Sequence, residues 1–190
     1  MGDARDNIGD GHAEGMVSTM AEGTYRGMPV AIDDLDQENL AYFHACADGV
    51  FKLQRGRKSG LLRYPPTTAC PWTRDREYDW VEVAGRGEVH SYTEVHHAIQ
   101  PVFKTYLPYL VLLVELDTQK GQPSEDEALR VLGNLVTPDG SMAPPEVVSK
   151  VGIGTRVRMV FTPVSEGIAI PNWTIDEAAT QPSKPWRYPD

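Results

Sequence analysis

The sequence has only two cysteines, Cys46 and Cys70, in 190 residues, which is too few for a disulfide scaffold. It has no apolar run close to the ~20 residues that span a bilayer. The N-terminus also lacks the basic segment and the following apolar segment of a secretory signal. Together these absences predict a cytoplasmic protein that works without a membrane.

Motifs of the common catalytic families are absent as well. The sequence has no Gly-rich phosphate loop, no Ser-centred nucleophile elbow and no zinc-protease helix. Gly85 and Gly87 give the first two glycines of a dinucleotide-binding loop, but the third is missing. We therefore expect no catalytic residues, which argues against an enzyme that acts by itself.

The net charge of −9 conceals one basic block in an otherwise acidic sequence. Residues 52–76 hold seven bases and one acid, a net charge of +6. Such a block fits nucleic acid, the phosphates of coenzyme A or an acidic face of a protein subunit, and it also fits a solvated surface on which charges cluster. The seven bases are Lys52, Arg55, Arg57, Lys58, Arg63, Arg74 and Arg76.

Two short turns between Leu53 and Trp80 have the spacing of zinc knuckles. Two residues separate the positions within each turn, and ten residues separate the turns. The four positions are Gly56, Ser59, Cys70 and Thr73. A structural zinc site needs four thiolate or imidazole ligands, and only Cys70 qualifies. We therefore expect no zinc, and the turns are either a recognition loop or a decayed structural element.

The residues around these turns resemble a known family. Its members are bacterial and archaeal proteins that join an N-terminal rubredoxin-like zinc ribbon to a C-terminal OB-fold, and they are associated with acyl-CoA metabolism. The family has cysteine at all four knuckle positions, so zinc binding does not carry over. The resemblance covers roughly three-quarters of the chain and keeps the order of the motifs. They are DGVFKLQR, SGLLRYPP, CPW, WVEVAGRGEVHSYTEVHH, PYLVLLVEL, NLV and VGIGTRVRMVF.

Pattern and resemblance together predict a mainly β protein with a five-stranded OB-fold barrel. A helix, capped by Asp34 or Asp36, and a degenerate rubredoxin-like zinc ribbon precede the barrel. The expected parts are a flexible arm at 1–32, the helix at 33–50, the ribbon at 51–79, the OB-fold at 80–175 and a Pro-rich tail at 176–190. The expected OB strands lie at 80–97, 109–116, 129–136, 156–161 and 168–173, with a short helix at 144–150.

Glycines at 85 and 87 predict a bulge that bends the first of these strands. Alternation along it places Val89, Ser91, Thr93 and Val95 on one face of the sheet.

The resemblance implies a non-catalytic accessory subunit. It would dock on and stabilise a thiolase-like enzyme acting on acyl-CoA, namely a thiolase, an acyltransferase or a sterol-carrier-protein-x-type aldolase, in steroid side-chain or other lipid or aromatic degradation. Family members also accompany hydratases. Without the ion, which contributes about 10 kcal/mol to folding, the ribbon needs support from a neighbour or a partner.

We expect two sets of contacts in such a hetero-oligomer. The first set would contact the partner or the phosphates of a coenzyme A thioester: Arg55, Arg57, Lys58 and Arg63. The second would shape the docking surface: Tyr64, Pro65, Pro66 and Trp72. The alternative is a single-stranded nucleic-acid-binding OB-fold. Residues 80–173, which carry a net charge of −4, oppose a phosphate track along the OB-fold.

Overall fold

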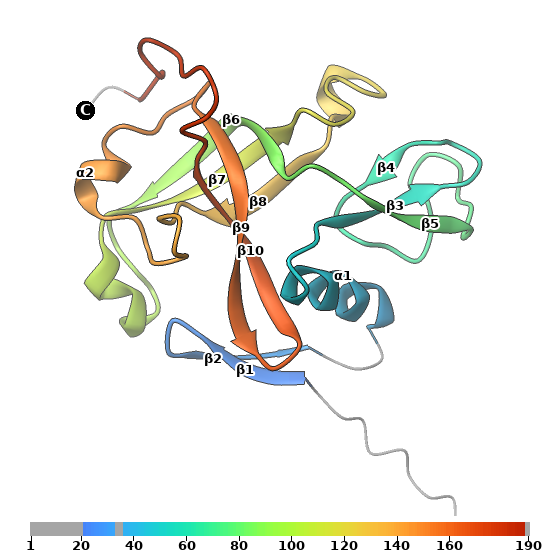
Figure 1. Ribbon diagram of the computed structural model, residues 1–190, viewed down its shortest axis with the longest axis horizontal. Coiled ribbons are helices and arrows are strands. Elements are labelled where there is room, and N and C mark those ends of the chain that lie inside the picture. Colours follow the sequence, from blue (N-terminus) through green and yellow to red (C-terminus); the bar gives the residue numbers. More distant parts are fainter. Residues whose placement is uncertain (1–20, 33–35, 189–190) are drawn as a thin grey trace, which may run out of the picture.

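The computed structural model describes residues 21–32 and 36–188, and Figure 1 shows their arrangement. A five-stranded antiparallel sheet forms the larger part, in the order β10-β9-β6-β7-β8. No helix among the described residues is long and apolar enough to cross a membrane. The strands are β6 (Arg86–Val95), β7 (Tyr109–Leu116), β8 (Arg130–Asn134), β9 (Arg156–Ser165) and β10 (Ile168–Ile175).

The OB-fold prediction is confirmed, but the predicted barrel is wrong because the sheet does not close. An isolated bridge between Leu135 and Trp173 is what joins the end of β8 to β10. There the Val136 N–H donates to the Trp173 carbonyl at 2.8 Å. The Trp173 side chain is fully buried and lies against Gly133, so packing fills the seam that a continuous ladder would occupy.

A three-stranded sheet lies beside the OB-fold in the order β4-β3-β5. Its strands are β3 (Lys52–Gly56), β4 (Leu62–Arg63) and β5 (Tyr78–Glu82). The prediction of one strand over 80–97 is therefore wrong, because β5 pairs with β3 and β6 pairs with β7. Gly85 separates the two strands, and a Cβ atom there would lie 2.7 Å from the Met159 Cβ.

The face prediction for β6 holds only as far as Val89, which is fully buried. A bulge between Val89 and Ser91 shifts the register against β7, so the bulge lies further along the strand than Gly85 and Gly87 suggested. Beyond it Ser91 and Thr93 are exposed, whereas Tyr92 packs against the core.

Helix α1 (Gln37–Ala47) packs against β10 and covers one side of the OB sheet. Asp36 caps its start by accepting the Asn39 backbone N–H at 3.3 Å. Of the two proposed caps, Asp34 lies outside the described residues. The helix ends before Gly49, whose φ of +76° suits a residue without a side chain.

An N-terminal hairpin closes the lower end of the sheet in Figure 1, where the sequence suggested no element. Its strands are β1 (Ala21–Tyr25) and β2 (Met28–Ile32). The Tyr25 hydroxyl donates to Asn172 Oδ1 at 3.3 Å and accepts from Asn134 Nδ2 at 2.9 Å. These bonds tie the hairpin to the seam between β8 and β10. The flexible arm expected at 1–32 otherwise falls outside the described residues.

The remaining short helices lie in connections. They are η1 (Pro101–Tyr106), η2 (Glu125–Glu127) and α2 (Pro145–Val148), of which α2 occupies the position predicted for a short helix. The C-terminal tail lies along the OB-fold: Trp186 and Ile153 exchange backbone hydrogen bonds of 3.1 and 2.8 Å. Arg187 binds Glu94 and the carbonyl of Val151.

Candidate functional site

Two turns of the three-stranded sheet face each other and bring the predicted knuckle positions together. The Gly60 N–H donates to the Gly56 carbonyl at 2.8 Å, and the Arg74 N–H donates to the Cys70 carbonyl at 2.8 Å. The Ser59 hydroxyl oxygen lies 3.6 Å from the Cys70 sulfur. A Cβ atom on Gly56 would lie 3.4 Å from the same sulfur. The sequence spacing therefore corresponds to a convergence in space.

The Cys70 thiol is buried inside this convergence and has a lowered pKa. Burial by itself would raise the pKa of the thiol. Hydrogen bonds from the side chains of Thr73 and Ser59 and from the backbone of Thr73 and Trp72 outweigh burial and lower the pKa to about 7. A substantial fraction of the sulfur is therefore ionised near neutral pH, stabilised by hydroxyl and amide groups.

These side chains do not fit a structural zinc ion. The four positions supply one thiol and two hydroxyls, and Gly56 supplies no side chain at all. Hydroxyl groups are not among the ligands of structural zinc sites. The residues that the structure describes contain no group of three or more His, Cys, Asp or Glu able to hold a metal ion. We therefore assign no metal-dependent role to the turns.

The loop between β7 and β8 supports the three-stranded sheet from outside. Gln119 Oε1 accepts the Leu62 N–H at 2.7 Å, and Gln119 Nε2 donates to the Leu62 carbonyl at 3.0 Å. On the second turn, Trp72 Nε1 donates to Glu127 Oε1 at 3.0 Å. This loop joins the two sheets through specific hydrogen bonds.

Two of the four predicted basic contacts form ion pairs within the three-stranded sheet. Arg57 lies 2.8 Å from an Asp79 oxygen and 3.1 Å from a Glu77 oxygen. The hydrogen bond and charge of Arg57 lower the pKa of the Asp79 carboxyl. Lys58 lies 3.7 Å from Asp75. All these cations are exposed, so a ligand or partner can still reach them.

The other two predicted basic contacts differ sharply in exposure. Arg55 is exposed, whereas Arg63 is only 2% exposed. Arg63 Nε donates to Gln54 Oε1 at 2.8 Å, and Arg63 Nη2 donates to the Thr67 carbonyl at 2.8 Å. Its guanidinium carbon also lies 4.9 Å from the centroid of the Tyr78 ring. Arg63 therefore belongs to the interior, and we exclude it from the surface contacts.

The predicted docking residues Tyr64, Pro65 and Pro66 line one groove together, whereas Trp72 does not line it. The groove has a volume of about 260 Å³ and lies where α1 and the three-stranded sheet meet the β8 edge of the OB sheet. Its other apolar side chains, which sequence reasoning missed, are Tyr42, Phe43, Val111, Leu132, Ile170 and Pro171.

Leu132 is the most informative of the missed residues. It is 55% exposed, and it lies in β8, which has a strand partner on one side only. A leucine at the outward position of an edge strand leaves apolar surface in water, which typically marks an interaction site. The consecutive apolar pair Val131-Leu132 was the signal in the sequence, because only one of two neighbours can face the core.

Comparison with known proteins agrees with this architecture. Residues 80–162 match the family model described as ChsH2, C-terminal OB-fold domain. The solved structure titled "Ltp2-ChsH2(DUF35) aldolase" contains a chain that is 30% identical, with a TM-score of 0.57. The alignment covers 75% of this chain and 97% of that chain.

Curated relatives carry related names. The "Probable enoyl-CoA hydratase alpha subunit" of Thermomonospora curvata is 31% identical over 72% of this chain, which spans 37% of that protein. The "3-oxo-4,17-pregnadiene-20-carboxyl-CoA hydratase alpha subunit" of Mycobacterium tuberculosis is 29% identical over 78% of this chain, which spans 43% of that protein. The "DUF35 domain-containing scaffold protein" of Methanocaldococcus jannaschii is 28% identical over 59% of this chain and 67% of its own length. The chain therefore belongs to the ChsH2/DUF35 family.

Proposed function

We propose that this chain is a non-catalytic accessory subunit of an enzyme that acts on acyl-CoA. It docks on and stabilises a thiolase-like partner, which is a thiolase, an acyltransferase or a sterol-carrier-protein-x-type aldolase. The partner carries out the bond chemistry, in steroid side-chain or other lipid or aromatic degradation. The observation that carries the proposal is the similarity along 97% of a chain in a structure titled as an aldolase.

The apolar groove beside β8 is the docking surface in this proposal. Tyr64, Pro65 and Pro66 form one wall, and Leu132 projects from the sheet edge. Burying such side chains stabilises a complex by about 25 cal/mol per Å² of apolar area. Polar residues, including Asn39 of α1, also line the groove, and protein interfaces commonly combine apolar and polar groups.

The exposed cations of the first turn border the coenzyme A channel in this proposal. Arg55, Arg57 and Lys58 lie on one turn and the strand before it. Exposed ion pairs such as Arg57–Asp79 contribute only about 0–1 kcal/mol, so phosphate groups can replace the carboxylates.

A single-stranded nucleic-acid binder is the alternative, and the structure offers less for it. The Arg63 guanidinium is buried, and residues 80–173 of the OB-fold carry a net charge of −4. A nucleic-acid track needs several free cations along the groove, together with exposed aromatic rings on which bases stack.

Co-purification tests the proposal. The tagged full chain would be co-expressed with candidate thiolase-like proteins from the same genome and analysed by size-exclusion chromatography. We expect one candidate to form a stable complex and to unfold at a higher temperature than it does alone. The proposal is wrong if the folded chain elutes alone with every candidate, or if it binds oligonucleotides with a steep salt dependence.

A further inference from the structure

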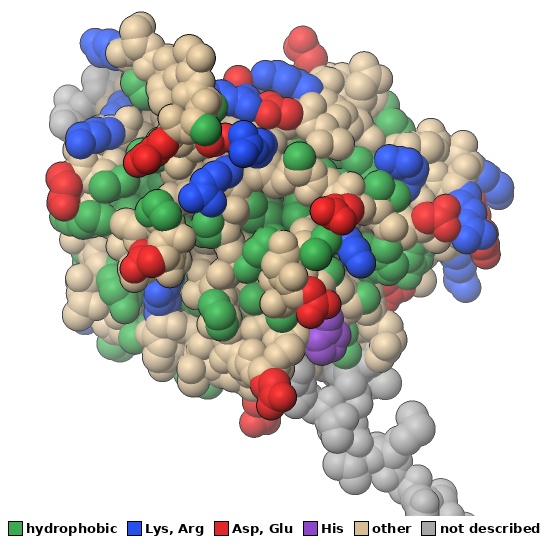
Figure 2. Space-filling view, viewed as in Figure 1, with side chains coloured by type: hydrophobic (Ala, Val, Ile, Leu, Met, Phe, Trp, Pro, Cys, Tyr) green, Lys and Arg blue, Asp and Glu red, His purple; other side chains and the backbone are tan. Residues whose placement is uncertain are grey.

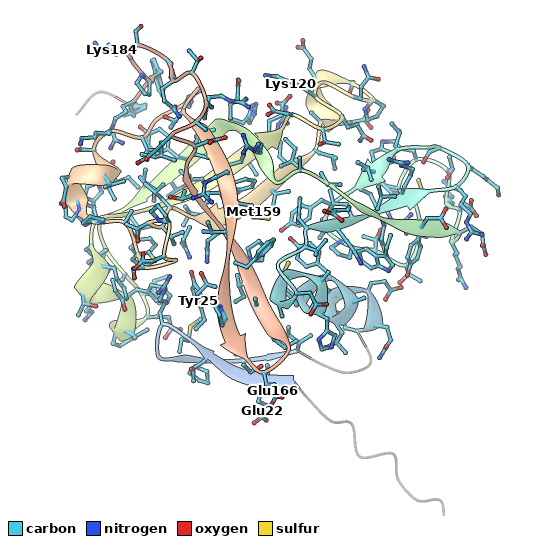
Figure 3. All side chains as sticks on the ribbon, in the orientation of Figure 1. Glu22, Tyr25, Lys120, Met159, Glu166 and Lys184 are labelled. Atoms are coloured by element: carbon cyan, nitrogen blue, oxygen red, sulfur yellow. The ribbon has the colours of Figure 1, made fainter. Side chains whose placement is uncertain are left out.

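A second groove runs along β9, between the β9–β10 hairpin and the C-terminal end of α1. It consists of two adjoining cavities of about 550 and 280 Å³, both lined by Gly49, Met159 and Phe161. Figure 2 shows hydrophobic side chains over this face of the molecule, with Lys and Arg side chains above them. Met159, labelled in Figure 3, lies in the middle of this face.

The groove exists because β9 loses its neighbour part of the way along. The β6–β9 ladder runs from Arg86 to Glu88, and the Met159 N–H extends it by donating to the Gly85 carbonyl at 2.7 Å. Beyond Met159 no ladder of the described strands pairs with this free edge of β9, although β1 contacts β9 near Val164. The larger cavity borders this free edge. Its lining is apolar apart from Ser165 and backbone atoms, and it includes Cys46 of α1 and Ile168 of β10.

The smaller cavity ends at two arginines. Arg86 and Arg158 are paired across β6 and β9. Asp176 lies 3.1 Å from the Arg86 guanidinium and is 3% exposed, so it neutralises that cation. The Arg158 guanidinium makes no hydrogen bond or ion pair with the described residues, although Arg158 is half-buried. Among the residues that line the smaller cavity, Glu82 is the acidic one, and it is exposed.

A partly buried guanidinium without a protein partner keeps its donors available for an anion such as a carboxylate. The apolar wall next to it requires that the same ligand also carry an aliphatic body. We propose that the groove binds a long-chain carboxylate, with the carboxylate on Arg158 and the chain along Met159 and Phe161. The site goes beyond the proposed docking function, since the chain itself would hold the ligand on a different groove.

The length of the groove and the position of the charge favour a free carboxylate over an acyl-CoA. The stretch of β9 from Arg158 to Pro163 extends over on the order of 16 Å at the rise of a strand. A fatty carboxylate has its charge directly at the end of its chain. In an acyl-CoA the thioester is uncharged, and the phosphates lie beyond the pantetheine arm.

Isothermal titration calorimetry on the full chain tests this site with decanoate, decanol and decanoyl-CoA as probes. We expect saturable binding of decanoate and binding of decanol that is weaker by about tenfold, since a charge-assisted pair is lost. Arg158→Gln should weaken decanoate binding by about the same factor. Arg76→Gln, which changes an exposed arginine outside both grooves, should leave decanoate binding unchanged.

The comparison of decanoate with decanol needs no variant, so the proposal can fail even if Arg158→Gln does not fold. Four results would overturn it: no saturable binding of decanoate, equal affinity for acid and alcohol, no effect of Arg158→Gln, or tighter binding of decanoyl-CoA than of decanoate. Co-purification of Arg158→Gln with a thiolase-like partner reports on docking separately, so each proposal can fail without the other.

Discussion

The Ser59 hydroxyl lies 3.6 Å from the Cys70 sulfur, at the point where two turns of the three-stranded sheet meet. Hydroxyl and amide groups surround the single thiol at this point. A hydrogen bond contributes about 1 kcal/mol net, whereas a structural zinc ion contributes about 10 kcal/mol or more. The turns must therefore draw stability from their surroundings, and the Gln119 and Trp72 contacts are one such source.

Replacing the three missing ligands should restore a metal site. In the variant Gly56→Cys/Ser59→Cys/Thr73→Cys, four thiols would converge, because the Gly56 Cβ position is already 3.4 Å from the Cys70 sulfur. We expect one zinc ion per chain by elemental analysis and a higher unfolding temperature with zinc than with chelator. Gly56→Ser/Thr73→Ser is the control and should bind none. Absence of zinc in the triple variant would mean that the four positions do not form a tetrahedron.

The lowered pKa of Cys70 makes stability depend on pH. Its folded-state pKa of about 7 lies below the ordinary value of 9.0, so the folded state favours the thiolate. This contribution is fully present above about pH 9 and is lost as the pH falls through about 7. We expect the wild type to gain about 2 kcal/mol over Cys70→Ser between about pH 6 and pH 9 in urea unfolding.

The other cysteine and a second variant serve as controls for that measurement. Burial raises the pKa of Cys46 to about 12, so this thiol stays protonated in the folded state throughout the range. Ser59→Ala keeps the thiol but removes one hydrogen bond, and it should move the Cys70 transition to higher pH. A flat difference between wild type and Cys70→Ser would show that Cys70 does not ionise in the folded state.

The support from the β7–β8 loop can be removed at one residue. Gln119→Ala leaves both backbone groups of Leu62 without their side-chain partner, which we expect to cost about 2 kcal/mol. Hydrogen exchange should show faster exchange at the Leu62 amide. Gln100→Ala, a change at an exposed glutamine before η1, should leave that amide unaffected. Unchanged exchange in Gln119→Ala would mean that the loop does not support the sheet.

The buried Arg63 should act on stability. Arg63→Ala removes hydrogen bonds to Gln54 and Thr67 from an interior position, and we expect a loss of about 3 kcal/mol in the free energy of unfolding. Arg63→Lys should not rescue it, because an ammonium group lacks the planar fork of donors. Arg55→Ala on the exposed side of β3 should change stability by less than about 0.5 kcal/mol. Equal losses of unfolding free energy in Arg63→Ala and Arg55→Ala would show that Arg63 is not a structural residue of the interior.

Local patterns in the sequence predicted the parts of the fold that depend on neighbours along the chain. The Asp36 cap and the Gly49 stop bracket α1 within a turn of the predicted limits. The spacing of Gly56, Ser59 and Cys70 was informative because tight turns constrain the positions that they join.

Features that depend on residues far apart in the sequence could not be predicted from local patterns. Arg63 is a basic residue in a basic block, and only its contacts with Gln54 and Thr67 explain its burial. The sequence from Trp80 onward has the pattern of one strand. It forms two strands because its first part, β5, pairs with β3 and its second part, β6, pairs with β7. The position of Leu132 at the edge of the OB sheet depends on the topology, which places β8 last in the strand order.

In the proposed complex this chain docks on an enzyme partner through the groove beside β8. Leu132→Asp places a charge on that groove at a residue that is 55% exposed, so the fold should tolerate it. Ile99→Asp is the matched control, because Ile99 is 90% exposed and does not line the groove. Co-purification with the thiolase-like partner is the measurement. We expect Leu132→Asp to abolish the complex and Ile99→Asp to preserve it. An intact complex with Leu132→Asp would show that the chain does not dock through this groove.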